Sequence, residues 1–475
     1  LVLVLAACSP AGSPTATEAT AAPDDATTTT APVDPTTTTT APPPVGIDAG
    51  PGLGDSLFPL LGNEGYDVLH VDLDLDVRPV FDGDPLEGVA VLTLDPLVAL
   101  DSFVVDAGDL DVSAITVDGE AAPFEPGSQL RIDPDPVLVP GEPVDVAITY
   151  SATVPPFPAS LPGRGGIGLT ESGLFAVGEP TGATTWRPAN DHPSDKATYE
   201  VTITAPEGFI PTAGGLVSEE PAPEGVVRRT SRHAHPVASY LVPLAVDRFV
   251  ESSWDGPSYE VRNYVTVGLP IDEELLASQV EMVAFFEELF GPYPFDAVGA
   301  LVVDQAFWGA LETQTLPTYA PNAVRGFVVA HEIAHQWVGN SVSLADWSDI
   351  WLNEGFATYA EWLWVDHVGA RPLADSVTEG HARTAASDAG FGPGEPPANE
   401  LFNRIVYDRG ALTLHALRAE VGDEAFFATL AAWTDRYAHA NATTADFIAL
   451  AEEVAGSELD DLFDAWLYGE LPPLP

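Results

Sequence analysis

The chain has 475 residues, of which 45% are hydrophobic, so it is long enough for two or three domains with cores of their own. Its 72 acidic and 17 basic residues give a formal charge of −55. A surface of this charge repels phosphate backbones, which argues against nucleic acid as a partner; the acidity otherwise indicates only a well-solvated surface.

The first eight residues predict a targeting signal. They form an apolar run that ends in Leu5-Ala6-Ala7-Cys8, as in the tail of a signal peptide. These four residues resemble the bacterial lipobox, in which the cysteine is lipidated and becomes the first residue of the mature chain. We therefore expect an extracytoplasmic, cell-surface lipoprotein, anchored to a bacterial membrane by a lipid on Cys8. An incidental cysteine in an apolar leader is the alternative.

Residues 9–55 are expected to form a disordered tether. Thr, Pro, Ala and Ser dominate this stretch, as in TTTTAPVDPTTTTTAPPP. Such a composition buries too little apolar surface to offset the entropy lost on ordering, which is typical of an extended linker. A glycosylated stalk is the alternative. No later segment offers about 18 continuous apolar residues, so we expect no membrane-spanning segment after the leader.

Residues 56–256 predict an antiparallel β domain. Near its start polar and apolar residues alternate, which places Leu69, Val71, Leu73 and Leu75 on one face of a strand. The same period of two recurs in VAVLTL, SFVVDA, VDVAITY and TYEVTIT, with Gly, Pro and Asp between the runs.

Residues 257–475 predict a domain of mixed α and β structure. The stretch IDEELLASQVEMVAFFEELFG has acids in its first turn, apolar residues three and four apart and Gly291 at its end, as in an amphipathic helix. Residues 298–304 indicate a buried strand, and a second helix is expected after Pro321. The rest of the chain predicts a short set of helices.

The strongest signal is the pentapeptide HEIAH. In a helix, His331 and His335 lie one turn apart on one face, with Glu332 beside them. Two neutral imidazoles and one further protein ligand leave a fourth zinc position open for water, as catalytic sites require. Glu354, nineteen residues beyond His335 in a second helical pattern, can be brought back to the metal. We predict one Zn²⁺ per chain, held by His331, His335 and Glu354, with Glu332 as general base. A histidine pair on an ordinary core helix is the alternative.

The sequence HEIAHQWVGN, followed by WLNEGFATY, resembles the aminopeptidase N-like family of zinc metallopeptidases, of the gluzincin type. The resemblance implies the same ligands and the same base. It also implies an N-terminal β saddle or sandwich followed by an α+β, thermolysin-like catalytic domain. Since the chain ends soon after VYDRGA, we expect a short C-terminal helical part and a more open cleft than in members with a large C-terminal domain.

The resemblance further implies residues that contact the substrate. GALET, residues 309–313, is similar to the family's Gly-Ala-Met-Glu-Asn motif, so Gly309 and Ala310 are expected to contact the peptide backbone and Glu312 its free amine. Glu179 matches the second amine-binding acid, and Tyr407 in VYDRGA matches the tyrosine that lies over the reacting carbonyl.

These features together predict a zinc aminopeptidase that removes N-terminal residues from peptides by attack of zinc-activated water. A pair of carboxylates, Glu179 and Glu312, would hold the free α-ammonium and fix the first peptide bond over the metal. Zinc and Glu332 alone serve an endopeptidase equally well, so a zinc endopeptidase of the same architecture is one alternative. A non-catalytic surface lipoprotein that binds peptides or cations is the other.

Overall fold

The computed structural model describes residues 46–157, 165–307 and 309–475. Cys8 and most of the predicted tether lie outside the described residues. Residues 46–55, which their composition assigns to the tether, belong to the folded body: Ile47–Asp48 (β1) pairs in parallel with Leu100–Asp106 (β4), and Asp55 is buried. No helix among the described residues is long and apolar enough to cross a membrane.

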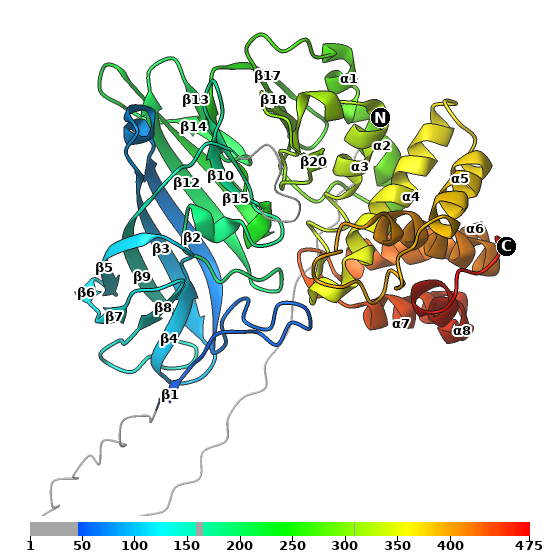
Figure 1. Ribbon diagram of the computed structural model, residues 1–475, viewed down its shortest axis with the longest axis horizontal. Coiled ribbons are helices and arrows are strands. Elements are labelled where there is room, and N and C mark those ends of the chain that lie inside the picture. The colour runs from blue at the N-terminus through cyan, green and yellow to red at the C-terminus, as the bar shows by residue number, and fades with distance from the viewer. Residues whose placement is uncertain (1–45, 158–164, 308) are drawn as a thin grey trace, which may run out of the picture. The chain divides into compact units, whose positions relative to one another are not determined.

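The N-terminal half is the predicted β domain. Its further strands are β2 Tyr66–Asp76, β3 Leu86–Pro96, β5 Asp111–Val117, β6 Glu120–Ala121, β7 Phe124–Glu125, β8 Gln129–Ile132, β9 Val144–Ala152, β10 Gly166–Leu169, β11 Leu174–Val177, β12 Lys196–Pro206, β13 Ile210–Thr212, β14 Leu216–Glu219, β15 Val226–Ala238 and β16 Leu244–Asp247. The main sheet has eight strands in the order β14-β15-β12-β2-β3-β9-β5-β6 (Figure 1). All its neighbours are antiparallel except β2 and β12. Two four-stranded sheets, β1-β4-β8-β7 and β10-β11-β16-β13, complete the domain.

A β-bulge near the start of β2 changes the alternation predicted for this strand. The pairing register with β3 shifts between Val68 and His70, so Leu69 is the extra residue. Val68 is buried and Leu69 is 42% exposed, which makes the prediction for Leu69 wrong. The predicted alternation holds from Val71 onward, where Leu73 is fully buried. A bulge adds one residue to one strand only, so a period of two cannot continue through it.

The C-terminal half contains a mixed sheet covered by helices. The strands are β17 Phe249–Asp255, β18 Glu260–Thr266, β19 Ala297–Val302, β20 Ala310–Leu311, β21 Thr318–Tyr319, β22 Ser343–Leu344 and β23 Asn441–Ala442. The α-helices are α1 Glu273–Ala277, α2 Gln279–Phe290, α3 Gly326–Ala334, α4 Trp351–His367, α5 Leu373–Ala385, α6 Gly410–Arg436, α7 Thr444–Ala455 and α8 Asp460–Phe463. Short 3₁₀ segments occupy Arg78–Asp82, Ala183–Thr185, Ser239–Leu241, Pro321–Ala323 and Trp347–Asp349, and π-helical turns occupy Ile405–Arg409 and Asp464–Tyr468.

The five-stranded sheet of this half has the order β17-β18-β19-β21-β20. Its edge strand β17 pairs with β18, although residues 249–255 are predicted from the sequence to belong to the first domain. The single helix predicted before Gly291 is divided at Ser278 into α1 and α2. β20 is the last strand of the sheet, so one of its edges has no strand partner among the described residues. The α+β class predicted for this half is confirmed.

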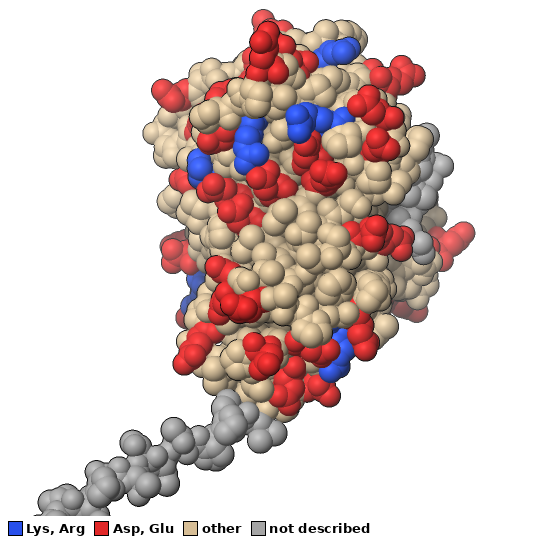
Figure 2. Space-filling model, turned by 90° about the vertical axis from the view of Figure 1, so that its left-hand side faces the viewer, with Lys and Arg blue, Asp and Glu red and all other residues tan. Residues whose placement is uncertain are grey.

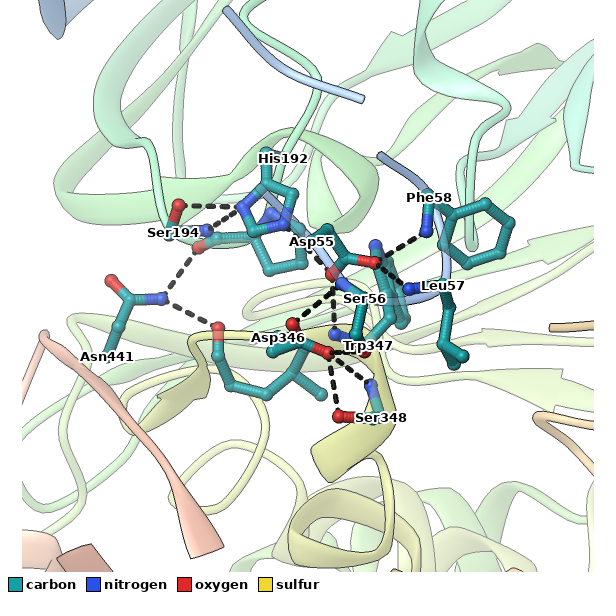
Figure 3. Close-up of polar contacts among 12 residues, drawn as sticks. Asp55, Ser56, Leu57, Phe58, His192, Ser194, Asp346, Trp347, Ser348 and Asn441 are labelled. Atoms are coloured by element: carbon teal, nitrogen blue, oxygen red, sulfur yellow. Dashed lines mark hydrogen bonds and ion pairs between the residues drawn. The ribbon is translucent and has the colours of Figure 1, made fainter. Parts of the chain in front are cut away.

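A network of hydrogen bonds joins the two halves where three loops meet (Figure 3). Oδ1 of the buried Asp55 accepts hydrogen bonds from the backbone N–H groups of Leu57 and Phe58, at 2.8 and 2.7 Å. Its Oδ2 accepts one from the backbone N–H of Trp347, at 2.8 Å, and lies 3.2 Å from Nε2 of His192. One carboxylate thus connects the N-terminal segment, the loop before β12 and the loop before α4.

Acidic side chains are spread over the face shown in Figure 2, with a few basic ones among them. Several of the arginines on the β domain are paired with acids, for example Arg228 with Asp74 at 2.7 Å and Arg232 with Glu200 at 2.8 Å. Exposed pairs of this kind contribute about 0–1 kcal/mol each. The surface charge therefore affects solvation more than the choice of fold.

Candidate active site and metal centre

Helices α3 and α4 carry the three predicted metal ligands. In α3, buried Val329 and Ile333 pack in the core and fix the face on which His331 lies, and His335 follows at the C-terminal end of the helix. Glu354 lies in the first turn of α4, which is buried along most of its length.

The ligand atoms of these three residues face one another. Nε2 of His331 lies 3.2 Å from Oε2 of Glu354, and Nε2 of His335 lies 3.5 Å from the same oxygen. The outer ring nitrogens are occupied elsewhere: Nδ1 of His335 is 3.1 Å from the carbonyl oxygen of Val338, and Nδ1 of His331 is 3.6 Å from Oε2 of Glu361. Such contacts orient metal-binding imidazoles and favour Nε2 as the ligand atom. Two nitrogens and one oxygen fit a catalytic zinc site.

The electrostatics of the cluster also suit a cation. Burial opposes ionisation of Glu354, but the charge of His335 and hydrogen bonds from both histidines lower the pKa of Glu354 to about 2. Burial disfavours the charged form of His331, yet contacts with Glu354 and Glu361 raise its pKa well above the usual value. The carboxylates thus stabilise positive charge at this point, whether it is carried by protons or by a metal ion.

Glu332 lies beside the predicted ligands. One of its oxygens is within 4.8 Å of ligand atoms of Glu312 and His335. Burial raises the pKa of Glu332 to about 8; the charges of the two histidines oppose this shift, and Glu312 and Glu354 add to it. A bound zinc ion would lower this pKa, because a cation stabilises a nearby carboxylate. Glu332 is therefore a buried carboxylate that can accept a proton at near-neutral pH.

Glu179 and Glu312 come from different halves of the chain and meet at the metal site. Glu179 follows β11 in the β domain, and Glu312 follows β20 in the second domain. Ligand atoms of Glu179, Glu312 and Glu354 lie within 4.8 Å of one another. Oε1 of Glu179 and Oε1 of Glu312 are buried and have no hydrogen-bond partner among the described residues. Burial raises the pKa of both carboxyl groups.

The segment that carries Glu312 is held by two side chains from the loop that follows α3. The carbonyl oxygen of Glu312 accepts hydrogen bonds from Nδ2 of Asn340, at 2.7 Å, and from Nε2 of Gln336, at 3.2 Å. Oε1 of Gln336 in turn accepts one from the backbone N–H of Thr315, at 2.8 Å. The neighbouring Ala310 lines the cavity in front of the metal residues, and the carbonyl oxygen of Gly309 accepts a hydrogen bond from the N–H of Ala320 at 2.9 Å.

Tyr407 lies in the π-helical turn Ile405–Arg409 and lines the same cavity. Its ring is stacked against that of His331, with the centroids 6.0 Å apart and the planes at 18°. Burial, together with the charges of Glu354 and the other acids of the site, raises the pKa of Tyr407 well above 10. The phenol therefore keeps its proton and can donate a hydrogen bond.

Other residues of the site were not predicted from the sequence. Glu361 lies seven residues after Glu354, two turns along α4 and on the same face, so its spacing is a signal that could have identified it. The buried Asp408 accepts hydrogen bonds from the partly exposed Arg383 at 2.7 and 2.9 Å at the cavity wall, and Arg404 lies 3.6 Å from the same carboxylate. No motif indicated these three.

The β domain, the helix pair and the donor set together define a zinc metallopeptidase. The Peptidase family M1 domain matches residues 275–466. Aminopeptidase M1-A of Oryza sativa subsp. japonica is 32% identical over 320 residues, which are 61% of this chain and 36% of that protein. Aminopeptidase 2 of Candida albicans is 25% identical over 436 residues, or 84% of this chain and 47% of that protein. The chain thus spans between a third and a half of the length of these curated relatives.

Solved structures match over almost their full length. One of them is an M1 zinc metallopeptidase variant from Deinococcus radiodurans, bound to a Tyr-Ser-Ala substrate. It superimposes with a TM-score of 0.83 at 33% identity, and the match covers 89% of this chain and 99% of the Deinococcus chain. The unsubstituted enzyme gives a TM-score of 0.81 at 33% identity, with 89% and 98% of the two chains covered. The chain belongs to peptidase family M1, and zinc is its cofactor.

Proposed function

We propose that the protein is a zinc-dependent aminopeptidase that removes N-terminal residues from peptides with a free amine. The observation that carries the proposal is the pair Glu179 and Glu312, each with a buried carboxylate oxygen that lacks a hydrogen-bond partner among the described residues. Leaving such an oxygen unsatisfied costs about 1–3 kcal/mol, more for a charged group. A substrate ammonium within reach of both carboxylates satisfies them by charge-assisted hydrogen bonds.

The mechanism follows from what each side chain can do. Zinc, when held by His331, His335 and Glu354, supplies Lewis acidity to the site. Glu332 takes a proton from the attacking water and passes it to the leaving amine. The protonated phenol of Tyr407 donates a hydrogen bond to the oxygen on which negative charge develops.

The position of the cut depends on the ammonium site. With the α-ammonium held between Glu179 and Glu312, the first peptide bond is the one within reach of the metal and Glu332. The edge of β20 beside Ala310 offers backbone groups with which an extended peptide can pair. An endopeptidase has no need of two buried acids aimed at a free amine.

The test compares aminoacyl anilides with their N-acetylated forms. We expect hydrolysis of the free amines only, with one zinc ion per chain by elemental analysis. Equal cleavage of both forms would indicate an endopeptidase instead. Binding of peptides without any hydrolysis, in protein that contains no zinc, would indicate the non-catalytic lipoprotein.

We also propose that the mature protein is attached to the outside of a bacterial membrane by a lipid on Cys8. The Leu-Ala-Ala-Cys sequence supports this proposal, and Thr- and Pro-rich residues between it and the folded body suit a tether. Mass spectrometry of the native protein should find an acylated N-terminal cysteine. An unmodified Cys8 would refute the proposal.

A further inference from the structure

The active-site cavity is lined by both acidic and basic side chains. Its volume is about 520 Å³, within the range of about 300–1,000 Å³ usual for small-ligand sites. The acids Glu179 and Glu312 and the arginines Arg383 and Arg404 are all among the residues that line it. In a chain with 72 acidic and 17 basic residues, two arginines in one cavity need a reason.

The arginines reach the site through Asp408, which pairs with both of them and directly follows Tyr407, whose ring is stacked on that of His331. Nε2 of His331 faces Glu354, which lies within 4.8 Å of the two amine-binding acids. Nδ1, on the other side of the imidazole, faces Glu361 at 3.6 Å, and Glu361, Arg383 and Arg404 line the same cavity. A peptide held by its ammonium at the acids and crossing the metal site can therefore reach the arginines within the same cavity.

The two arginines differ in how far their donors are already used. All three guanidinium nitrogens of Arg383 already have acidic partners: Nε and Nη2 donate to Asp408 at 2.9 and 2.7 Å, and Nη1 lies 3.0 Å from Glu379. Arg404 makes one ionic contact among the described residues, from Nε to Asp408 at 3.6 Å, which is too long for a hydrogen bond. Its side chain is 73% exposed, so the two terminal nitrogens of its guanidinium are free to bind a ligand.

We propose that Arg404 binds the C-terminal carboxylate of short peptide substrates, with Arg383 and Asp408 holding it in place. A guanidinium donates two parallel hydrogen bonds to a carboxylate, and its planar fork fits that group better than it fits an amide or a carbonyl. At about 3.3–3.6 Å per extended residue, di- and tripeptides are the substrates whose carboxylate stays close to the metal. The inference rests on the proposed aminopeptidase activity and adds a substrate class: short peptides with a free C-terminus.

The test uses a tripeptide as the free acid and as the C-terminal amide, with the same N-terminal residue. The wild-type protein should cleave the acid with a kcat/KM roughly tenfold higher than that of the amide, mostly through a lower KM, as expected for one charge-assisted hydrogen-bonding pair at an exposed site. Arg404→Gln should remove this preference, and Arg404→Lys should retain only part of it. Arg436→Gln, at an exposed arginine that pairs with Glu453 away from the cavity, is the matched control.

Each outcome has a distinct meaning. Equal cleavage of acid and amide by the wild type, or an equal loss for both in Arg404→Gln, would overturn the inference and leave the aminopeptidase proposal standing. A further peptide amide that carries an acidic side chain at its second residue is assayed as well. If only this amide depends on Arg404 for a high kcat/KM, Arg404 binds that side chain and the inference is overturned. If neither peptide is cleaved, the proposed function fails, and the carboxylate site is tested by calorimetric binding of both peptides to the Glu332→Gln variant. Tighter binding of the acid, lost when Arg404→Gln is added, supports the site. Equal binding of acid and amide refutes it.

Discussion

At the scale of single residues, the proposed mechanism assigns proton transfer to Glu332. It is buried, it lies beside the predicted ligands without completing the His-His-Glu set, and it is the base that the proposed mechanism requires. Glu332→Gln preserves size and removes the proton acceptor. We expect a loss of about 10²- to 10⁴-fold in kcat, the usual contribution of a general base, with zinc content unchanged. The measurement is turnover of an aminoacyl anilide beside elemental analysis, with exposed Glu420→Gln as control; full activity would remove Glu332 from the mechanism.

Glu361 has a smaller predicted effect at the same scale. Its carboxylate lies 3.6 Å from Nδ1 of His331, a contact that orients the ring but is longer than a hydrogen bond. Outer-sphere partners of metal-binding histidines typically contribute 10- to 100-fold in metal affinity, and the long distance favours the lower figure. Glu361→Gln should weaken zinc binding by about tenfold in competition with a chelator. A variant with unchanged zinc affinity would show that the ring is held without Glu361.

At the scale of elements, β15 carries a buried histidine whose protonation should affect stability. Nε2 of His233 lies 2.7 Å from the carbonyl oxygen of Ala213, and Nδ1 is buried without a partner among the described residues. Burial lowers the pKa of His233 to about 4, and the hydrogen bond to Ala213 only partly offsets this shift. The unfolded chain takes up a proton near pH 6.5 and the folded one near pH 4, so stability is lost as the pH falls through this interval.

The expected size of this loss is about 3 kcal/mol between pH 6.5 and pH 4. Asp106 and Asp195 act in the opposite sense, because burial raises the pKa of each to about 7 and their protonation on acidification stabilises the folded state. The histidine is therefore isolated by comparing urea unfolding of His233→Gln with the wild type across this range. As the pH falls, the unfolding free energy of His233→Gln should increase relative to that of the wild type. The unfolding free energy of His367→Gln, at an exposed histidine, should follow that of the wild type.

The sequence predicted the elements that depend on the spacing of neighbouring residues in the chain. The one-turn spacing of His331 and His335 predicts that both imidazoles share one helix face, whereas the approach of Glu354 to them is a contact between two helices. The alternation in β2 predicts Leu73 correctly and fails at Leu69, because a bulge depends on how the partner strand pairs. A helix periodicity also cannot show that Ser278 divides α1 from α2.

At the scale of the whole molecule, the site depends on contacts that no local pattern encodes. Asp55 bonds to His192 and Trp347, which are 137 and 292 residues away in the chain, and its own segment resembles a linker in composition. The hydrogen bonds of Asp55 are among several contacts that dock the half carrying Glu179 on the half carrying Glu312; others run from Lys196 to the carbonyl oxygen of Asn340 and from Gly215 to Thr315.

This dependence gives the last prediction. Asp55→Asn replaces one acceptor oxygen of the Asp55 hydrogen-bond network with an NH₂ group. This group cannot accept hydrogen bonds from backbone N–H groups, so the substitution should cost about 1–3 kcal/mol of stability. Looser docking of the two halves separates Glu179 from Glu312, so KM for free-amine substrates should rise while zinc content stays the same, because all three ligands lie in the second domain. Thermal unfolding, KM and elemental analysis are compared with Asp109→Asn, at an exposed aspartate of the β domain. A lower Tm with unchanged KM would mean that Asp55 stabilises the fold without positioning the ammonium site.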